Sequence, residues 1–545
     1  MSFKSFPIYR LEELIGSVTL KKISEILPAF DSTIEADTIY TKVNLVKIIY
    51  SFYDSNEFSK IELRKEYLTY QDEIKINDFC LIVNISKDLS YEDKIEKIIR
   101  KGWSNVQFCN LFCDHFELPL KFIPNERTIE SNHEIVFNHN KPFKLLKDYQ
   151  SKIYFKSIEY LQRRNSKFII QMPTGSGKTR TAMEIIADSF LNNHSECIIF
   201  WLVYSEELCE QAVECFKEVW SHVGNKEVKL IRAWGKNDLT LNQDDKFAFI
   251  VGGFQKLFSL HQRNNTYFNQ IRDRTYLIIV DEAHRVLAPT YKSVTDSIFG
   301  KNSRLIGLSA TPGRGINQDE QNIKLSSYFN EEKIDIEPSE NQTVFSYLKS
   351  KGIMSYVEYK PLYTSPSYVL TPKDVEYLEN NFDFSSSFLK KIGEDEKRNL
   401  EILHELLEQL KIHNKAIFFG CSIEHSKFIC SMLNYLGIKA AHIDGSTNKG
   451  TRQNILNDFK KGDLAIICNY GILSTGFDAP KTDLVFISRP TRSIVLYSQM
   501  IGRGLRGPAV GGTENCSIIT VKDNIHGLPN ESDIFLFFDE YFEKS

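Results

Sequence analysis

The sequence predicts an α/β protein with two parallel-sheet domains in tandem, preceded by a mostly helical N-terminal accessory domain. Short β-rich runs alternate with helical stretches twice, once within residues 141–345 and again within residues 396–525. The 545 residues suffice for three or four cores, since one domain usually takes about 100–200 residues. With 42% hydrophobic and 25% charged residues, the chain has the composition of a folded soluble protein, which excludes a largely disordered one.

The N-terminal domain is predicted to span residues 1–140. Residues 44–53 and 91–103 place apolar side chains three and four positions apart, as amphipathic helices do. Residues 78–86 read instead as a short buried strand. This domain carries 17 basic and 22 acidic residues, and a polar stretch near residues 132–141 connects it to the next domain.

Each of the two following domains is predicted to form a parallel sheet flanked by helices, because strands and helices alternate along the chain. The expected strands of the first domain lie at 167–172, 197–204, 246–253, 276–282 and 304–311. Those of the second lie at 415–422, 439–446, 464–471, 484–490 and 516–523. Between the two domains, residues 346–395 are expected to form a linker with inserted helices, and residues 526–545 a tail whose phenylalanines pack back onto a domain.

The formal charge of −4 argues against a strongly basic nucleic-acid coat. Because residues 141–545 carry 50 basic and 49 acidic side chains, any nucleic-acid contact there is expected to be a local groove. The ten cysteines lie mostly in apolar runs, which favours reduced thiols in a cytoplasmic protein. No signal peptide or membrane-length apolar run is evident, so we expect no membrane contact.

A phosphate-binding loop is predicted directly after the first strand of the first α/β domain. It comprises Gln171, Met172, Pro173, Thr174, Gly175, Ser176, Gly177, Lys178 and Thr179. Two glycines let the backbone curl so that its N–H groups face a phosphate, and the following helix adds positive partial charge. Lys178 can reach the terminal phosphates, and the Thr179 hydroxyl can bind Mg²⁺. Met172 stands where the strict pattern has glycine, so the loop is a variant nucleotide site.

A second candidate motif, residues 277–284, places two carboxylates at the end of a buried strand. Ligands of open α/β sheets bind at this end of the strands. Asp281 is expected to hold the Mg²⁺ shell, while Glu282 orients or deprotonates the attacking water.

The third candidate motif lies near the end of the second α/β domain. Arg503 and Arg506 stand three residues apart and therefore lie on one helix face. A planar guanidinium with a permanent charge suits the charge that develops on a transferred phosphate, so both are candidate arginine fingers.

Together these motifs resemble the helicase-type motors of superfamily 2, which are ATPases with two RecA-like domains and a DEAH box. The resemblance covers residues 145–525, about seven-tenths of the chain. The runs MPTGSGKT, DEAH, SATP, STGFDAP and QMIGRGLR most resemble the bacterial restriction-enzyme-type branch, the ResIII-like helicases that act on DNA.

The resemblance implies roles for further residues. Gln150 is expected to read adenine with Tyr149 packing beside it, and Gly476 and Asp478 are expected on the nucleotide side. Asn469 stands where the family often has a threonine. The remaining implied positions are Gln499 in the catalytic set, His284, Ser309 and Thr311 in coupling, and Ser205, Gly253, Gln255, Ser422, Gly445 and Ser446 at the nucleic acid.

The expected function is that of an ATP-dependent DNA helicase or translocase that uses ATP and Mg²⁺. DNA is favoured over RNA, and the acidic helical N-terminal domain suits a separate protein partner. A role in defence against phage or in DNA repair is an expectation at family level. Two alternatives stay open: a nucleotide-gated DNA sensor or recruitment protein without strand separation, and an RNA helicase.

Two weaker patterns lie in the N-terminal domain. Cys109, Cys113 and His115, with His133 and His139 further on, allow a zinc site, but the apolar neighbours favour core packing of the thiols. The run of residues 92–94, with an acid before it, allows a nuclease fragment, but its charged helical context favours an ordinary helix surface.

Overall fold

A computed structural model provides the structure of the chain. It describes residues 2–30, 36–53, 58–86, 88–103, 105–119, 122–124, 133–136, 145–310, 319–338, 342–381, 383–447, 449–472 and 481–526.

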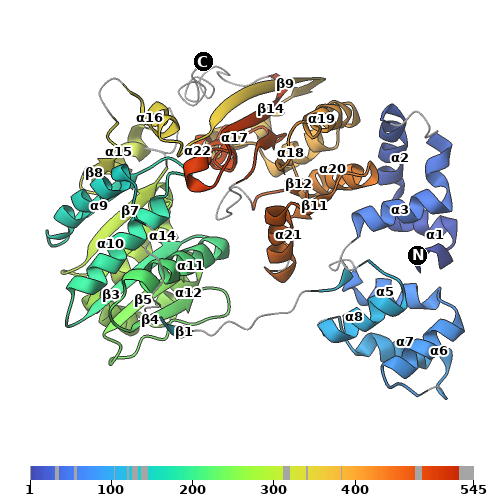
Figure 1. Ribbon diagram of the computed structural model, residues 1–545, viewed down its shortest axis with the longest axis horizontal. Helices are drawn as coiled ribbons and strands as arrows, with labels where there is room; N and C mark the ends of the chain where they lie inside the picture. Colours follow the sequence, from blue (N-terminus) through green and yellow to red (C-terminus); the bar gives the residue numbers. More distant parts are fainter. Residues whose placement is uncertain are drawn as a thin grey trace.

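The N-terminal domain is helical throughout its described residues up to 124 (Figure 1). Its helices are α1 (Ile8–Ile15), α2 (Ser17–Ile26), α3 (Lys42–Phe52), α5 (Ile61–Thr69), α6 (Glu73–Ile82), α7 (Tyr91–Arg100) and α8 (Val106–His115), with short 3-10 turns at Ser2–Ser5, Leu27–Ala29 and Ala36–Tyr40. An aromatic cluster fills the core, in which Phe58 packs edge-on against Tyr67, Trp103 and Phe122 at centroid distances of 5.0–5.2 Å.

The first α/β domain, named the first motor domain after the family that its motifs resemble, contains an eight-stranded sheet in the order β1-β4-β5-β3-β6-β7-β2-β8. All neighbours pair in parallel except β1, which runs antiparallel to β4 at the edge. The strands are β1 (His133–Val136), β2 (Lys167–Gln171), β3 (Cys197–Val203), β4 (Val228–Ala233), β5 (Phe247–Gly253), β6 (Thr275–Asp281), β7 (Arg304–Ser309) and β8 (Lys333–Asp335). The helices are α9 (Asp148–Leu161), α10 (Lys178–Asn192), α11 (Glu206–Val223), α12 (Phe254–Arg263), α13 (Asn265–Arg274), α14 (Pro289–Ile298), α15 (Asp319–Tyr328) and α16 (Val344–Ser350), with a 3-10 turn η5 (Ala283–Arg285) after β6.

Both faces of this sheet are buried, so its central strands are apolar on both sides. Alternate residues of β3 face opposite ways: Ile199, Trp201 and Val203 join the core beneath α9, α10 and α11. Ile198, Phe200 and Leu202 join the core beneath α12, α13, α14 and α15. The continuous apolar runs of the sequence follow from this two-sided burial.

The second motor domain contains a six-stranded parallel sheet in the order β11-β12-β10-β13-β14-β9. The strands are β9 (Tyr356–Val369), β10 (Ala416–Phe419), β11 (Ala440–Ile443), β12 (Ile466–Asn469), β13 (Leu484–Ile487) and β14 (Asn515–His526). The helices are α17 (Pro372–Asn381), α18 (Ser386–Gly393), α19 (Glu396–Gln409), α20 (Ile423–Tyr435), α21 (Lys449–Lys461) and α22 (Ile494–Ile501), with a 3-10 turn at Pro508–Val510. The expected fold class, two tandem RecA-like domains behind a helical N-terminal region, is confirmed.

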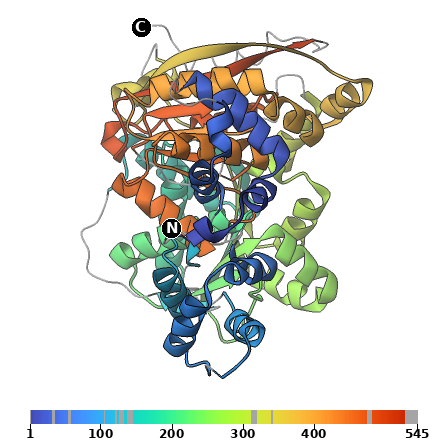
Figure 2. The same ribbon diagram turned by 90° about the vertical axis from the view of Figure 1, so that its right-hand side faces the viewer.

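The N-terminal helices pack on the second motor domain, where α2 and α3 meet α19 and α20 (Figures 1 and 2). Ser431 of α20 donates a hydrogen bond to the carbonyl of Ser51 over 3.3 Å, and the Lys47 ammonium lies 4.0 Å from the ring centroid of Tyr435. Helices α5 to α8 lie farther from the motor, at the lower right of Figure 1.

The structure corrects two local expectations. Residues 78–86 were expected as a strand, yet α6 covers residues up to 82, because Asp72 caps the helix and Ile76, Phe79, Cys80 and Val83 face the core at helical spacing. Residues 346–395 were expected as a linker with inserted helices; α17 and α18 lie there, but the segment also contains β9, which extends the second sheet beside β14. Strand β1 also lies in the stretch expected to connect the first two domains. The tail beyond His526 lies outside the described residues.

Candidate ATP site and nucleic-acid face

The phosphate loop connects β2 to α10 in the conformation that its glycines allow. Gly175 and Gly177 adopt φ values of 85° and 88°, in the left-handed region that side chains with a Cβ rarely enter. Helix α10 begins at Lys178, and Thr179 is its second residue. The loop therefore leads directly into a helix N-terminus, where anions are stabilised.

Tyr149 and Gln150 of α9 fix the conformation of this loop through hydrogen bonds. The Tyr149 hydroxyl and the Gln150 side-chain amide both donate hydrogen bonds to the carbonyl of Ser176, over 2.7 and 3.2 Å. A Cβ at Gly177 would lie 2.2 Å from Gln150 Nε2, so a side chain there would displace the Gln150 amide from the loop. In this structure both expected adenine-side residues therefore contact the loop itself.

Asp281 and Glu282 lie at the carboxyl end of β6, facing the phosphate loop. Burial, with a smaller contribution from Glu282, raises the pKa of Asp281 to about 6, while the Lys178 ammonium opposes the rise. Burial also raises the pKa of Glu282, but Lys178, His284, Arg285 and Arg503 together bring it below its ordinary value. Glu282 has a φ of 54° and ψ of 54°, a conformation that non-glycine residues seldom adopt outside functional turns.

His284 and Ser309 lie beside these carboxylates. His284 is buried, with its Nδ1 3.4 Å from Glu282 Oε2. Ser309 ends β7, and its carbonyl accepts a hydrogen bond from Met172 N over 3.0 Å, which connects it to the start of the phosphate loop. Thr311 lies outside the described residues.

The second motor domain brings Arg503 and Arg506 to the same site, and Gln499 lies one helical turn before Arg503. Burial lowers the pKa of Arg503 to about 10 even though Glu282 opposes the shift, which places Arg503 within electrostatic reach of that carboxylate. Burial also lowers the pKa of Arg506, whose Cγ would lie 3.6 Å from a Cβ on Gly175. The buried Gln499 Nε2 has no hydrogen-bond partner among the described residues.

The segment between the motor domains fixes the arginine turn, a feature that the sequence patterns did not reveal. Ser355 N donates to the carbonyl of Leu505 over 3.0 Å, and Ser355 Oγ lies 2.6 Å from the carbonyl of Arg506. Gly507 N donates to the carbonyl of Ile353 over 2.8 Å. These bonds depend on long-range pairing, so no local signal in the sequence encodes them.

The carboxyl edge of the first sheet divides into two halves. The nucleotide-side residues follow β2, β6 and β7, which are adjacent in the sheet. The residues expected at nucleic acid follow β3 and β5: Ser205 caps α11, Gly253 precedes α12, and Gln255 is exposed. The division falls between the paired strands β3 and β6.

The second sheet carries its expected nucleic-acid residues after β10 and β11. Ser422 is buried, and its hydroxyl caps α20 by accepting from His425 N over 3.1 Å. Gly445 and Ser446 are exposed. Ser446 donates twice to Asp444 Oδ1, over 2.7 and 2.6 Å, which holds this loop in one conformation.

Of the three remaining positions expected near the nucleotide, the structure describes one. Asn469 is fully buried at the end of β12, where its Nδ2 donates to the carbonyl of Phe418 over 2.9 Å. Gly476 and Asp478 lie outside the described residues.

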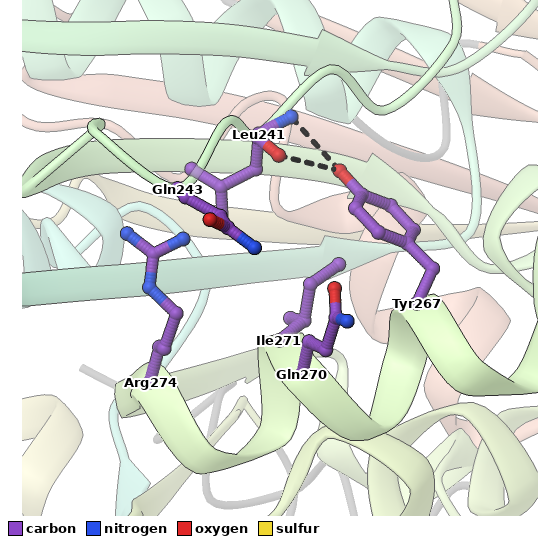
Figure 3. Close-up of a pocket in the computed structure, with 6 residues that line it drawn as sticks. All are labelled: Leu241, Gln243, Tyr267, Gln270, Ile271 and Arg274. Carbon is purple, nitrogen blue, oxygen red and sulfur yellow. Dashed lines mark hydrogen bonds between the residues drawn. The ribbon is translucent and has the colours of Figure 1, made fainter.

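A small cavity of about 330 Å³ lies at the opposite, amino edge of the first sheet (Figure 3). The Tyr267 hydroxyl accepts from Leu241 N over 2.9 Å and donates to the Leu241 carbonyl over 3.1 Å. Arg274 donates to the carbonyls of Asn242 and Asp245 and pairs with Glu196 at 2.7 Å. Because these polar groups already form hydrogen bonds and an ion pair within the chain, we interpret the cavity as a structural feature and not as a ligand site.

In the N-terminal domain, Cys109 and Cys113 lie in the core, where burial raises the pKa of each thiol to about 12. The His115 ring hydrogen-bonds the carbonyl of Lys75 over 2.8 Å. In the stretches that the structure describes, no group of three or more His, Cys, Asp or Glu side chains is arranged to hold a metal. Residues 92 and 93 are exposed in α7, whereas residue 94 is buried, so these charges do not converge.

The fold and this site define a class, the two-domain ATP-dependent motors of helicase superfamily 2. Residues 143–314 match the family model "Type III restriction enzyme, res subunit", and residues 398–507 match "Helicase conserved C-terminal domain". The chain is therefore a superfamily 2 helicase with a ResIII first motor domain, as its motifs predicted.

The curated relatives match this chain over part of its length. IRC3 of Saccharomyces cerevisiae, a candidate ATP-dependent helicase, is 26% identical over 66% of this chain and 49% of its own length. A type I restriction enzyme EcoAI endonuclease subunit of Escherichia coli is 20% identical over 66% of this chain and 44% of its own length. The chain thus spans about half the length of these relatives. Proteins named as RNA helicases are also among the relatives.

Among solved structures, the DUF1998 helicase MrfA bound to DNA superimposes with a TM-score of 0.51, at 15% identity, over 76% of this chain and 53% of its own. At that identity the likeness concerns the fold alone. No helix in the described part of the chain is long and apolar enough to cross a membrane.

Proposed function

We propose that this protein is a DNA-dependent ATPase that couples ATP hydrolysis to movement along DNA. The observation that carries the proposal is the meeting of two half-sites at the domain interface. Lys178, Asp281 and Glu282 come from the first motor domain, and Gln499, Arg503 and Arg506 come from the second.

The chemistry divides between these side chains. Lys178 and the backbone of the phosphate loop bind the terminal phosphates, and Gln150 and Tyr149 hold that loop in shape. Glu282 orients the attacking water, and Arg503 and Arg506 stabilise the charge that develops on the transferred phosphate. Gln499, a buried donor without a partner among the described residues, suits an oxygen of the phosphate or the water.

The donor set also fits Mg²⁺. Asp281 is buried and its pKa is raised to about 6, so a cation would relieve the cost of its charge, and the Thr179 hydroxyl follows the loop directly. When bound with ATP, Mg²⁺ would neutralise phosphate charge; the protein's part is to hold the ion at these two side chains.

Movement follows from the same geometry. ATP bound between the two half-sites draws the domains together, and hydrolysis releases them. The residues expected at nucleic acid lie on the carboxyl edges of both sheets, so closure displaces Ser446 relative to Ser205. Alternation of these positions moves the chain along a strand.

DNA is proposed over RNA because the first motor domain matches a restriction-enzyme family and a restriction-enzyme subunit is among the relatives. The deciding experiment measures ATP hydrolysis with single-stranded DNA, duplex DNA or RNA of the same sequence. We expect stimulation by DNA. Stimulation by RNA alone would assign the protein to the RNA helicases, and a flat rate with every nucleic acid would refute the proposal.

A second function, a nucleotide-gated DNA sensor, shares the ATP site and differs in its output. The observation that favours the sensor is the packing of α2 and α3 on the second motor domain. Because of this packing, the N-terminal helices move with that domain on closure. DNA-stimulated ATPase without strand displacement or protein displacement from DNA would support the sensor.

The N-terminal domain is proposed to bind a separate protein. Ile74 and Leu81, seven residues apart on α6, are 73% and 54% exposed. The domain carries an excess of acidic residues, so a partner with an apolar, basic-rimmed surface would complement it. Loss of a co-purifying partner on Ile74→Glu, with unchanged ATPase, would support this surface. A phage-plating assay tests the further proposal of a role in defence.

A further inference from the structure

We infer that Tyr204 and Arg285 form the contact through which nucleic acid bound by the first motor domain controls the catalytic glutamate. The inference rests on the proposed function and adds two positioning residues to it. Neither is among the site residues that the family resemblance implies: Tyr204 follows β3, and Arg285 ends the turn after Asp281 and Glu282.

The sheet brings the two residues together. Strands β3 and β6 pair in parallel with Leu202 opposite Val280, so the residues that follow the two strands emerge side by side at the carboxyl edge. These strands are also the boundary between the nucleic-acid half and the nucleotide half of that edge. A contact between their ends therefore crosses from one half to the other.

The contact is a stacked cation and ring. The guanidinium carbon of Arg285 lies 3.9 Å from the centroid of the Tyr204 ring, well inside the ~6 Å range of a cation–π contact. Tyr204 is partly buried and packs against the cores on both faces of the first sheet, which fixes the ring in place. No hydrogen bond or ion pair of the Arg285 guanidinium is found among the described residues, so the ring is its principal partner.

On the nucleotide side, the pair acts on the groups around Glu282. Arg285 N donates to the carbonyl of Glu282 over 3.0 Å, which fixes the left-handed turn that aims the carboxylate. The charge of Arg285 also favours the ionised form of Glu282, and Tyr204 lies within electrostatic reach of Arg503. The pair therefore acts on the electrostatic environment of both proposed catalytic groups, Glu282 and Arg503.

On the nucleic-acid side, Tyr204 is joined by one peptide bond to Ser205. The Ser205 side chain accepts from Leu208 N over 3.4 Å, a long cap that leaves this hydroxyl weakly held. A nucleic-acid phosphate that takes the Ser205 hydroxyl shifts the backbone at Tyr204, and the ring carries Arg285 with it. Binding thereby changes the position of the Glu282 turn.

The test compares maximal DNA-stimulated and basal ATPase rates in full-length variants. Arg285→Gln and Tyr204→Leu are expected to lower the ratio of stimulated to basal rate about 2- to 30-fold, the range that one cation–π contact supports. Tyr204→Phe keeps the ring and is expected to retain the ratio, and Arg285→Lys keeps the charge and is expected to be intermediate. The DNA concentration for half-maximal stimulation should stay within about twofold of wild type.

A matched control lies at the other end of the same sheet. Arg304, at the start of β7, stacks at 4.5 Å on Tyr276, near the start of β6. Tyr276→Leu removes an equivalent contact from the amino edge and is expected to leave the ratio unchanged, with melting temperatures checked for all variants.

Each outcome decides the inference. Unchanged ratios in Arg285→Gln and Tyr204→Leu, with a stimulated wild type, overturn the inference and leave the proposed function intact. An equal loss in Tyr276→Leu overturns it as a general effect on the domain. A rise in half-maximal DNA concentration with an unchanged maximal ratio overturns it in favour of simple binding. A wild type that DNA does not stimulate overturns both proposals.

Discussion

Gly502 lies where the two motor domains touch, and its replacement by alanine tests that contact. The residue is buried at the end of α22, one position before Arg503. A Cβ there would lie 2.4 Å from Thr174 Cγ2 and 2.8 Å from Thr174 Cβ in the phosphate loop. Its φ of −57° suits any residue, so the clash with Thr174 arises from the contact between domains, beside a 2.9 Å approach to the carbonyl of Ser498 in the second domain.

The expected magnitude follows from the overlap. Carbon atoms in contact normally lie about 3.5–4.0 Å apart, so the added methyl intrudes by more than 1 Å and must push the domains apart or displace the loop. Overpacking of this kind costs about 1–3 kcal/mol. If closure bears that cost, the closed population and the ATPase rate fall about 5- to 160-fold.

The assay measures ATP hydrolysis at saturating ATP together with thermal unfolding. Gly502→Ala should lower the rate by more than any loss of thermal stability explains, because the closest approach, to Thr174, lies between the domains, whereas the 2.9 Å approach to the Ser498 carbonyl lies within the second domain. Thr174→Ser removes Cγ2 and keeps the hydroxyl. In the double variant the nearest atom becomes Cβ at 2.8 Å, so we expect a partial rescue and a non-additive cycle.

A wild-type rate in Gly502→Ala would refute the reasoning, because it would mean that this interface is not used during hydrolysis. Strictly additive effects of the two substitutions would likewise contradict a direct contact between Thr174 and Gly502.

The remaining predictions concern the ATP site and the core of the second domain. Lys178→Ala should abolish ATP hydrolysis and weaken ATP binding, measured by turnover and by calorimetry; normal turnover would contradict the site. Glu282→Gln should retain ATP binding and lower turnover by at least about 100-fold, since it removes the group that activates water; trapping of a closed state would appear as slower nucleotide release. Removal of Mg²⁺ by chelation should abolish hydrolysis, with recovery when the ion is restored. Asp523→Ala should lower the free energy of unfolding by about 3–5 kcal/mol, because the fully buried Arg398, which donates to Asp523 over 2.6 and 2.8 Å, would lose its counter-ion; a loss below about 1 kcal/mol in denaturant titration would contradict this account.

The sequence predicted the local parts of the ATP site because each part is encoded within a few residues. The left-handed backbone conformation at positions 175 and 177 favours glycine. Helix α10 begins at Lys178, directly after these two residues, whatever the position of the preceding strand. The buried strands were predicted from continuous apolar runs. Residues 78–86 were misread because the short apolar run obscured a helical spacing that began at Ile76, so length and context favoured the wrong period.

Other features depend on residues far apart in the chain, and no local pattern reports them. The place of β9 beside β14 depends on pairing across about 150 residues, and the clamp of Ser355 on Leu505 and Arg506 depends on the same pairing. The docking of α3 on α20 depends on complementary apolar faces. The sequence of each helix shows that it has an apolar face but not which helix that face will contact.

By itself, the sequence predicted which residues would bind phosphate and supply charge at the proposed ATP site, since glycine torsions and carboxylates at strand ends are local properties. Only the tertiary structure decided that Arg503 and Arg506 meet Glu282 and Gly175 across a domain interface, and that Tyr204 stacks on Arg285. Sheet register and domain packing set these contacts, and both arise from the summed burial of apolar surface over the whole chain, which no short segment specifies.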